Sequence, residues 1–350
     1  MGNDYIKEFL TIQQDFNYKP QLWDDCKISF QGDTYATVSH VKNKVQCHAK
    51  RIDLFHYQNV KTGEIKMYET LTREEAERVR IRSMKRAFGE LTGLIRTNFT
   101  NAKEYGGMST AHNQKFIMLS YRENMTDEQR LYIDFKYFID RLEYEYPHDY
   151  EYISVVEPQG RGAWHIHLML KASDVSEFWI DKEKLTKIWG HGATQIQELK
   201  SNDVGAYYTA YFTGVFSNHN GIKAKQSKTG DDAFETEQRL TEAVEAYSSM
   251  TGLNLSERQK ELKKKHLKGA RVSMYPKGMR FYRCSRGVDR PEKVAGTLIS
   301  LSGYKKVYER GYSIDNTTEM TNPETGEVIT ETENLNKVYH STYRKKGVDE

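Results

Sequence analysis

The chain has 350 residues, of which 37% are hydrophobic and 29% are charged. This composition is ordinary for a globular protein with one large domain or two modest ones. No apolar run approaches the roughly 18 residues of a membrane-spanning helix, and the N-terminus lacks the pattern of a secretory signal. The cysteines Cys26, Cys47 and Cys284 form no CxxC pair, which argues against a disulfide scaffold or a cysteine zinc site and favours a reducing cytoplasm.

The first part of the chain, residues 1–70, contains strand-like pieces but no recognisable chemistry, and we expect an accessory segment there. A helix is predicted from Arg73 to Asn98, because Thr72 as N-cap and Glu75 three residues later complete a capping box. Apolar residues alternately three and four apart give this helix one stripe for a core. They are Ile81, Met84, Phe88, Leu91 and Ile95.

From Lys115 onward, strands and helices alternate. We expect a strand at Phe116–Tyr121, then a helix over residues 127–146 that starts at the cap Thr126, and a shorter helix near Glu183–Ile188. The longer helix should turn one set of residues inward: Leu131, Phe135, Phe138 and Leu142. A hairpin between the helices forces an antiparallel pair, so the pattern predicts an α+β fold.

That hairpin, Glu151–Leu170, carries the most informative pattern in the chain. His165 and His167 alternate with apolar residues, so both imidazoles should project from one face of the strand and the apolar stripe from the other. Glu157 ends the preceding strand, and a glycine-rich turn can fold it back towards them. We call Glu157, His165 and His167 the triad. One carboxylate and two imidazoles are suitable metal ligands, although a lone strand histidine is more often structural.

A second stretch, Ser201–Gly214, can form a short helix with an N-cap at Asn202 or Asp203. Tyr207 and Tyr211 are four residues apart, so their phenols should lie on one helix face. The alternative is that these aromatic residues are core, as aromatic stripes at helical spacing usually are.

The two stretches together resemble the HUH endonuclease superfamily, specifically the rolling-circle replication initiators of bacterial plasmids and phages. The motifs that match are FIMLSY and EPQGRGAWHIH, and DVGAYYTAYFTG as the third. LTKIWGHG looks like the approach to the third motif, and YPKGMRFYRCSRGVDRP resembles the C-terminal half of plasmid initiators. The resemblance covers residues 82–216, and the order and spacing of the motifs make it specific.

The resemblance implies an antiparallel sheet of about five strands, flanked by helices, with N-terminal and C-terminal additions. It also implies that the triad holds Mg or Mn and that a tyrosine attacks DNA to leave a 5′-phosphotyrosine. Tyr207 and Tyr211 are the candidates, with the role of each unassigned. Ala210 and Gly214 stand where many relatives have a lysine, so the group that neutralises the phosphate stays open.

The region after the tyrosine stretch divides into a polar insertion or hinge, residues 217–257, and a basic region, residues 258–350. Between Arg258 and Lys293 there are thirteen Lys/Arg and three acidic residues, a net charge of +10. Basic side chains interleaved with aromatic ones suit nucleic-acid binding. The alternative interpretation is that these basic residues simply form a solvated surface. The candidate DNA contacts are Lys263, Lys264, Lys265, Arg280, Arg283 and Arg286, with Arg161 in the hairpin turn. After Pro291 we expect short strands such as GTLISLSG, and a disordered tail from Tyr339.

Residues 71–216 are therefore predicted to be the nuclease core of an initiator of rolling-circle plasmid replication. Its partners would be the double-strand origin and single-stranded DNA in a bacterial cytoplasm, with a host helicase as an open further partner and no membrane. An HUH transposase or relaxase is a near alternative, although relaxases place their tyrosine before the histidines. A metal-dependent hydrolase and a non-catalytic DNA-binding regulator are the alternatives from other classes.

Overall fold

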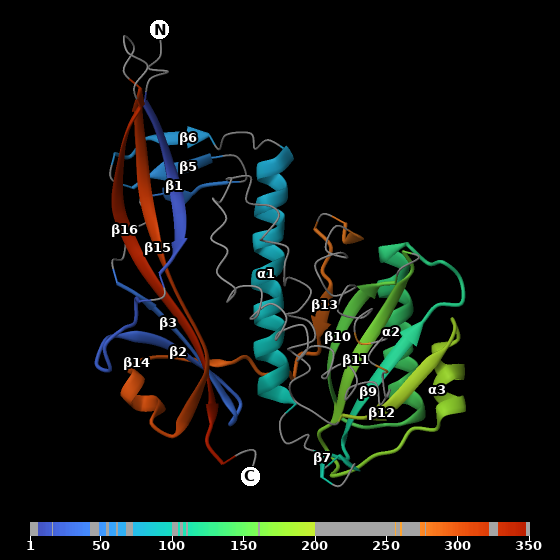
Figure 1. Cartoon of the computed structure of the whole chain (residues 1–350). Coiled ribbons are helices and arrows are strands. Elements are labelled where there is room, and N and C mark those ends of the chain that lie inside the picture. Colours follow the sequence, from blue (N-terminus) through green and yellow to red (C-terminus); the bar gives the residue numbers. More distant parts are fainter. Residues whose placement is uncertain are drawn as a thin grey trace. The chain divides into compact units, whose positions relative to one another are not determined.

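The computed structural model describes most of the chain (Figure 1). The described residues are 6–15, 17–42, 49–53, 56–60, 62–67, 73–99, 104–105, 108–109, 111–159, 162–199, 256, 260, 274–276, 278–321 and 328–347. They form two compact units. Unit 1 combines Met1–Thr72 with Pro291–Glu350, and unit 2 is the continuous segment Arg73–Arg290.

A five-stranded sheet forms the centre of unit 2, with the order β12-β9-β11-β10-β13 and every neighbouring pair antiparallel. Its strands are β9 (Gln114–Ser120), β10 (Tyr150–Pro158), β11 (Trp164–Ala172), β12 (Thr194–Glu198) and β13 (Tyr282–Cys284). The expected α+β class with an antiparallel sheet is confirmed. A separate two-stranded sheet joins β7 (Glu104–Tyr105) and β8 (Met108–Ser109).

Three helices accompany this sheet: α1 (Arg73–Asn98), α2 (Glu128–Glu145) and α3 (Lys182–Trp189). The bounds of α1 are those predicted from the sequence, and its predicted N-cap Thr72 lies outside the described residues. The predicted cap of α2 is wrong by one residue: Asp127, not Thr126, accepts hydrogen bonds from the backbone N–H groups of Gln129 and Arg130. A carboxylate at this position also interacts favourably with the positive end of the helix dipole.

The helices cover both faces of the sheet, with α1 on one side and α2 and α3 on the other (Figure 1). All four residues of α2 predicted to point inward are buried. Phe88, Leu91 and Ile95 of the α1 stripe are buried in the same apolar cluster. One core therefore runs through the whole thickness of unit 2 and holds the sheet rigid between its helices.

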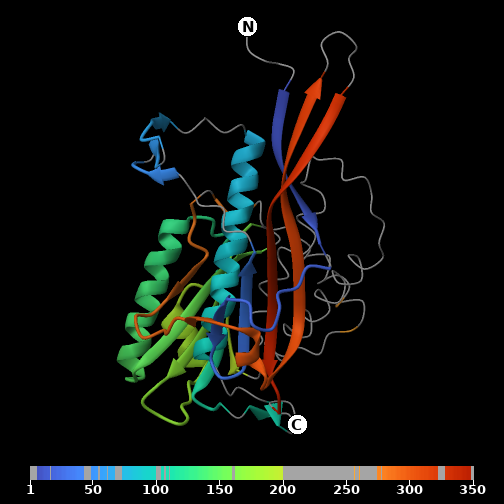
Figure 2. The ribbon, with the colours of Figure 1, turned by 90° about the vertical axis from the view of Figure 1, so that its left-hand side faces the viewer.

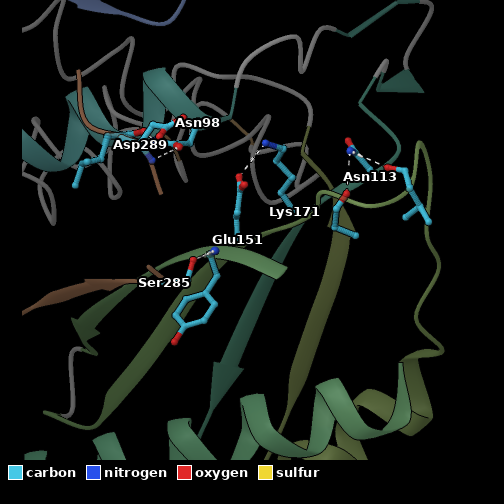
Figure 3. A network of polar contacts seen from close by, with 10 residues as sticks. Asn98, Asn113, Glu151, Lys171, Ser285 and Asp289 are labelled. Atoms are coloured by element: carbon cyan, nitrogen blue, oxygen red, sulfur yellow. Dashed lines mark hydrogen bonds and ion pairs between the residues drawn. The ribbon is translucent and has the colours of Figure 1, made fainter. Parts of the chain in front are cut away.

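Polar contacts fasten β13 and the loop after it to the rest of unit 2 (Figure 3). The Ser285 hydroxyl oxygen accepts a hydrogen bond of 3.0 Å from the backbone N–H of Tyr152 in β10. The Asn98 side chain at the end of α1 donates to the Asp289 carbonyl at 2.8 Å and accepts from the Asp289 N–H at 2.7 Å. The loop that follows β13 is thus held at both ends, at Ser285 and at Asp289.

Unit 1 is built on a six-stranded antiparallel sheet with the order β1-β15-β16-β3-β2-β14. The strands are β1 (Ile6–Gln14), β2 (Cys26–Gln31), β3 (Tyr35–Val41), β14 (Glu292–Gly296), β15 (Tyr304–Thr321) and β16 (Val328–Lys345). Cys26, Ile28, Ala36, Val38 and Leu301 form its small core. A three-stranded sheet of β4 (Ala49–Arg51), β5 (His56–Asn59) and β6 (Ile65–Met67) completes the unit.

The strands β15 and β16 form a long hairpin whose two arms twist about each other (Figure 2). This corrects two expectations. The tail from Tyr339 is strand up to Lys345 and not disordered, because it pairs with β3 as well as with β15. The run GTLISLSG is not a strand but contains a 3-10 helix, Leu298–Leu301.

One ion-pair cluster stabilises this hairpin from the side. Glu309 of β15 accepts hydrogen bonds from Lys19 at 2.8 Å, from Tyr339 at 2.9 Å and from Lys306. Burial acts to raise the pKa of Glu309, but these three hydrogen bonds outweigh it and lower the pKa to about 2. The charged form of Glu309 is therefore strongly favoured in the folded sheet.

No described helix is long and apolar enough to cross a membrane. Of the three cysteines, Cys26 is buried and Cys284 is exposed, and neither forms a disulfide within the described residues. Cys47 lies outside the described residues.

Candidate metal centre

The hairpin of β10 and β11 brings the triad together. Glu157 lies directly opposite His165 in the antiparallel register, and His167 is two residues further along β11. The turn is closed by a 2.7 Å hydrogen bond from the Gln159 N–H to the Ala163 carbonyl. Gly162 has a φ of 91°, which residues with a side chain rarely adopt. This turn lets the carboxylate at the end of one strand face the imidazoles at the start of the next.

The donor atoms of the triad converge on one point. Glu157 Oε2 lies 2.8 Å from His167 Nε2 and 3.5 Å from His165 Nε2, and one ligand atom from each residue can be chosen so that all lie within 4.8 Å of one another. Ligands at about 2.1 Å from a shared ion stand about 3.0–3.4 Å apart in octahedral or tetrahedral geometry. The spacing therefore fits a metal ion.

Burial of the triad is nearly complete. The exposed side-chain fraction is 2% for Glu157, 1% for His167 and 12% for His165. A carboxylate removed from water is costly unless positive charge compensates it, and a divalent cation or a protonated imidazole would do so. The triad can therefore bind a metal ion with His165 as the ligand nearest to solvent. Its donor types do not identify the metal, since imidazole and carboxylate together suit several divalent ions.

The opposite face of β11 is apolar, as the alternation predicts. Trp164, Ile166, Leu168 and Leu170 are all buried in the core. Because they fix the strand from behind, the two histidines have little freedom to move apart. Packing of this kind preorganises ligands that the sequence places at period two.

A segment from the far end of unit 2 secures the β10 backbone beside Glu157. The N–H of Val156 donates to the Phe281 carbonyl at 2.7 Å, and the Tyr275 hydroxyl donates to the Val156 carbonyl at 2.9 Å. Arg80 of α1 in turn donates to the Tyr275 carbonyl at 2.9 Å. Phe88 of α1 stacks on Phe281 with ring centroids 4.0 Å apart. Both backbone groups next to the carboxylate ligand are thus held by partners that are themselves fixed.

A polar cluster fixes the end of β9, the other neighbour of β11. Ser120, opposite His165 in the register, accepts a hydrogen bond of 3.0 Å from the Trp189 indole through its carbonyl. Tyr121 donates to Asp134 at 3.0 Å. Burial first, and then the Asp134 carboxylate, raise the pKa of Tyr121 far above its usual range. The Tyr121 phenol therefore stays protonated and donates this hydrogen bond, so the role of Tyr121 is structural.

Gly192 allows the loop after α3 to approach this strand end. A Cβ at Gly192 would collide with the backbone of Ser120, Tyr121 and Arg122, so no side chain fits without movement of the main chain. The Arg122 N–H donates to the His191 carbonyl at 2.9 Å across the same approach. This close approach explains why the run LTKIWGHG ends in a glycine, which the sequence alone did not show.

The other predicted site residues fall into two groups. Arg280, Arg283 and Arg286 are exposed and lie in or beside the edge strand β13. The remaining candidates lie outside the described residues: Tyr207, Tyr211, Arg161, Lys263, Lys264 and Lys265. Their roles stay predictions.

Sequence reasoning missed two features. One is the support of β10 by Tyr275, and the other is a stack of Arg283 on the Tyr132 ring, with the guanidinium carbon 3.5 Å from the ring centroid. Both join residues more than a hundred positions apart, so no spacing within the sequence reveals them. The only signal was the basic and aromatic composition of the run YPKGMRFYRCSRGVDRP.

Fold and site together define unit 2 as an α+β unit whose antiparallel sheet presents a buried carboxylate and two imidazoles, able to hold a metal ion. Residues 114–215 match the family model described as Replication-associated protein ORF2/G2P. The match covers less than a third of the chain and includes the triad. No curated protein and no solved structure gives a significant match.

Proposed function

We propose that this protein is a metal-dependent DNA-nicking and strand-transfer enzyme of the HUH type that initiates rolling-circle replication of a plasmid. The observation that carries the proposal is the convergence of the triad within the segment that matches the replication-associated family model. The antiparallel five-stranded sheet beneath the triad agrees with the fold that the resemblance implies.

In this proposal the triad holds Mg or Mn at the end of the hairpin. When bound, the ion would act as a Lewis acid that withdraws charge from the scissile phosphate. Glu157 contributes the negative charge that makes a dication favourable in a buried site. His165 is the most exposed of the three ligands, so in this proposal the DNA approaches the ion from its side.

Tyr207 or Tyr211 is the proposed nucleophile. Its phenol oxygen attacks phosphorus while the 3′-oxygen of the preceding nucleotide leaves, so the downstream strand stays attached through a 5′-phosphotyrosine and the upstream strand ends in a 3′-hydroxyl. The phenolic proton must leave the attacking oxygen, since free tyrosine, with a pKa of about 10, is mostly protonated at neutral pH. One phosphodiester replaces another, so the step is reversible and needs no ATP. The chain accordingly lacks a GxxxxGK[ST] phosphate-binding run.

The basic surface serves binding in this proposal. Arg280, Arg283 and Arg286, with Arg161 and the lysines at 263–265, would neutralise DNA phosphates at the double-strand origin and on the single strand. The nuclease core would lie within residues 71–216 and the DNA-binding region within 258–350, with 1–70 as an accessory segment and 217–257 as a hinge. A host helicase stays an open further partner, which would act on the strand that is released.

A covalent-capture experiment tests the proposal without knowledge of the origin. The protein is incubated with Mn²⁺ and a pool of single-stranded DNA of random sequence, labelled at either the 3′ or the 5′ end, and is then denatured. We expect the 3′ label, and not the 5′ label, to remain on the protein, because the downstream fragment carries the phosphotyrosine. Sequencing of the captured strands would then identify the cleavage site.

Four variants sharpen the result. His165→Ala should abolish the adduct, whereas the control His148→Ala, at an imidazole paired with Asp174 at 3.0 Å, should retain it. Tyr207→Phe and Tyr211→Phe should differ in effect. Cleaved DNA without an adduct would indicate a hydrolase, and binding without cleavage would indicate a regulator; either result rejects the proposal.

A further inference from the structure

Arg283 and Tyr132 form a stacked pair at the surface of unit 2. The guanidinium carbon of Arg283 lies 3.5 Å from the centre of the Tyr132 ring. The Tyr132 hydroxyl donates a 2.9 Å hydrogen bond to the Arg280 carbonyl, which fixes the ring against the segment that carries β13. Arg283 is exposed, although its planar group rests on an aromatic ring. Such a pair is a preformed platform, because the ring restricts the guanidinium without neutralising it.

The stacked pair borders an open cavity of about 300 Å³. Its apolar lining comes from one side of α2 and from β10, and two charged side chains of α2 complete it. The lining residues are Tyr132, Ile133, Phe135, Lys136, Ile139, Asp140, Tyr152 and Arg283. This volume is at the lower end of the ~300–1,000 Å³ typical of small-molecule pockets. It therefore suits one flat ring.

The cavity lies on the face of the sheet opposite the triad. Tyr152 and Glu157 are five residues apart in the same strand, whose register with β11 is continuous. Side chains alternate along a strand, so these two project from opposite faces. Phe135 of α2 contacts Tyr152 edge to face, with ring centroids 5.7 Å apart, which places the cavity on the α2 side. It is consequently a separate site from the metal centre.

We infer that this cavity binds an unpaired nucleobase of single-stranded DNA, stacked on the Arg283 guanidinium. The inference rests on the proposed function, which requires the protein to hold a single strand. Bases that are not paired are held in proteins by stacking on aromatic rings and on arginine planes. Lys136 and Asp140, one turn apart on α2, offer a donor and an acceptor to the edge of the ring.

Charge and shape favour a base over other occupants. Arg280 and Arg286 flank the cavity residue Arg283 in sequence, and all three are exposed, so a phosphate backbone can pass along the edge strand while its base turns inward. An isolated phosphate would gain no favourable contact from the apolar side chains of Phe135 and Ile139 in the cavity lining. A cavity of this size is also too small for a helix or an extended peptide.

Two strands of equal length separate base binding from phosphate binding. One is a fluorescently labelled thymidine homopolymer, and the other is an all-abasic strand with the same backbone and charge. Dissociation constants are measured for both by fluorescence anisotropy at one fixed salt concentration, since the salt sets the phosphate contribution. The dissociation constant of the abasic strand divided by that of the thymidine strand, which we call the base-dependent ratio, measures how much the bases contribute to binding.

Arg283→Lys is the informative variant, because it retains the charge and loses the plane. We expect it to lower the base-dependent ratio about tenfold, which corresponds to about 1.4 kcal/mol, and to weaken binding of the abasic strand much less than Arg283→Ala does, because lysine keeps the charge that neutralises the phosphate. Arg283→Ala should lower the ratio equally and weaken both strands. Arg290→Lys is the matched control: Arg290 is exposed in the same segment but does not line the cavity, and its ratio should equal that of the unmodified protein.

Two results would overturn the inference. If Arg283→Lys leaves the ratio within twofold of the unmodified protein, Arg283 contacts only phosphates. If neither Arg283 variant changes the binding of either strand, the stack on Tyr132 serves the fold alone. Failure of the proposed function looks different: no covalent adduct would form in the capture experiment, whatever the base-dependent ratio shows.

Discussion

Replacement of Glu157 by glutamine separates a metal ligand from a structural residue, because only a metal ligand predicts a change in the stabilisation that added metal provides. The carboxylate is 2% exposed and 2.8 Å from His167 Nε2. An amide has nearly the same shape and can still form a hydrogen bond there. Without metal, any change in stability reports only on the contact with the imidazoles, and it is destabilising where an imidazole is protonated. With metal, the variant should lose the stabilisation that the ion provides.

The size of the effect follows from mass action. At Mn²⁺ a hundredfold above its dissociation constant, binding stabilises the folded state by about 2.7 kcal/mol. For a unit the size of unit 2 this raises Tm by roughly 5–10 °C. Even supporting residues of metal sites affect affinity by about 10–100-fold, so loss of a charged ligand should cost at least about 100-fold. The same Mn²⁺ concentration then stabilises Glu157→Gln by only about 0.4 kcal/mol, or about 1–2 °C.

Tryptophan fluorescence during heating is a suitable assay. Trp164 and Trp189 are buried in unit 2, whereas Trp23 of unit 1 is 69% exposed, so the signal reports mainly on unit 2. Glu198→Gln is the matched control, since Glu198 is also paired with an imidazole, His112 Nδ1 at 3.1 Å, but lies outside the triad. It should retain the full Mn²⁺-dependent rise. A full rise in Glu157→Gln, or none in the unmodified protein, would refute the metal assignment.

Three further predictions concern the supports of the site and the sheet of unit 1. Gly192→Ala should lower the stability of unit 2 by about 1–3 kcal/mol in thermal melts, because its Cβ meets backbone, whereas Gly89→Ala in open space on α1 should raise it by up to about 1 kcal/mol. Tyr275→Phe removes the hydrogen bond to the Val156 carbonyl and should weaken Mn²⁺ binding measured by calorimetry; unchanged affinity would show that β10 needs no such support. The pKa of Glu309 is lowered from 4.5 to about 2, so its contribution is present above pH 4.5 and is lost as the pH falls towards 2. Glu309→Gln should therefore be less stable by about 1–2 kcal/mol at neutral pH and should lose less stability on acidification, as followed by circular dichroism; parallel pH profiles would contradict this.

Local patterns predicted much of unit 2. The bounds and apolar stripe of α1, the inward residues of α2 and the alternation around His165 and His167 are properties of neighbouring residues, which sequence periodicity records. The cap of α2 was misplaced because Thr126 and Asp127 are both good caps, and only the backbone angles decide between them.

Unit 1 was harder to predict because its order depends on partners far along the chain. The C-terminal part of β16, from Tyr339 on, contains basic and polar residues typical of a solvated tail, and it becomes a strand by pairing with β3 and β15. The strand-like run GTLISLSG instead contributes Leu301 to the small core, through one tight turn. The Arg283–Tyr132 stack escaped prediction for the same reason, since nothing near either residue indicates the other.

The strand pairing in unit 1 constrains the order in which the parts of the protein can fold during synthesis. Strand β1 pairs with β15 and β3 with β16, whereas unit 2 is one uninterrupted segment between them. During synthesis on the ribosome, β2 and β3 can pair with each other at once, but β1 must wait for β15, and the outer edges of β2 and β3 for β14 and β16. Unit 2 has all its described strands by residue 284 and can fold earlier, so a nascent chain would form the hairpin that carries the triad before its six-stranded sheet.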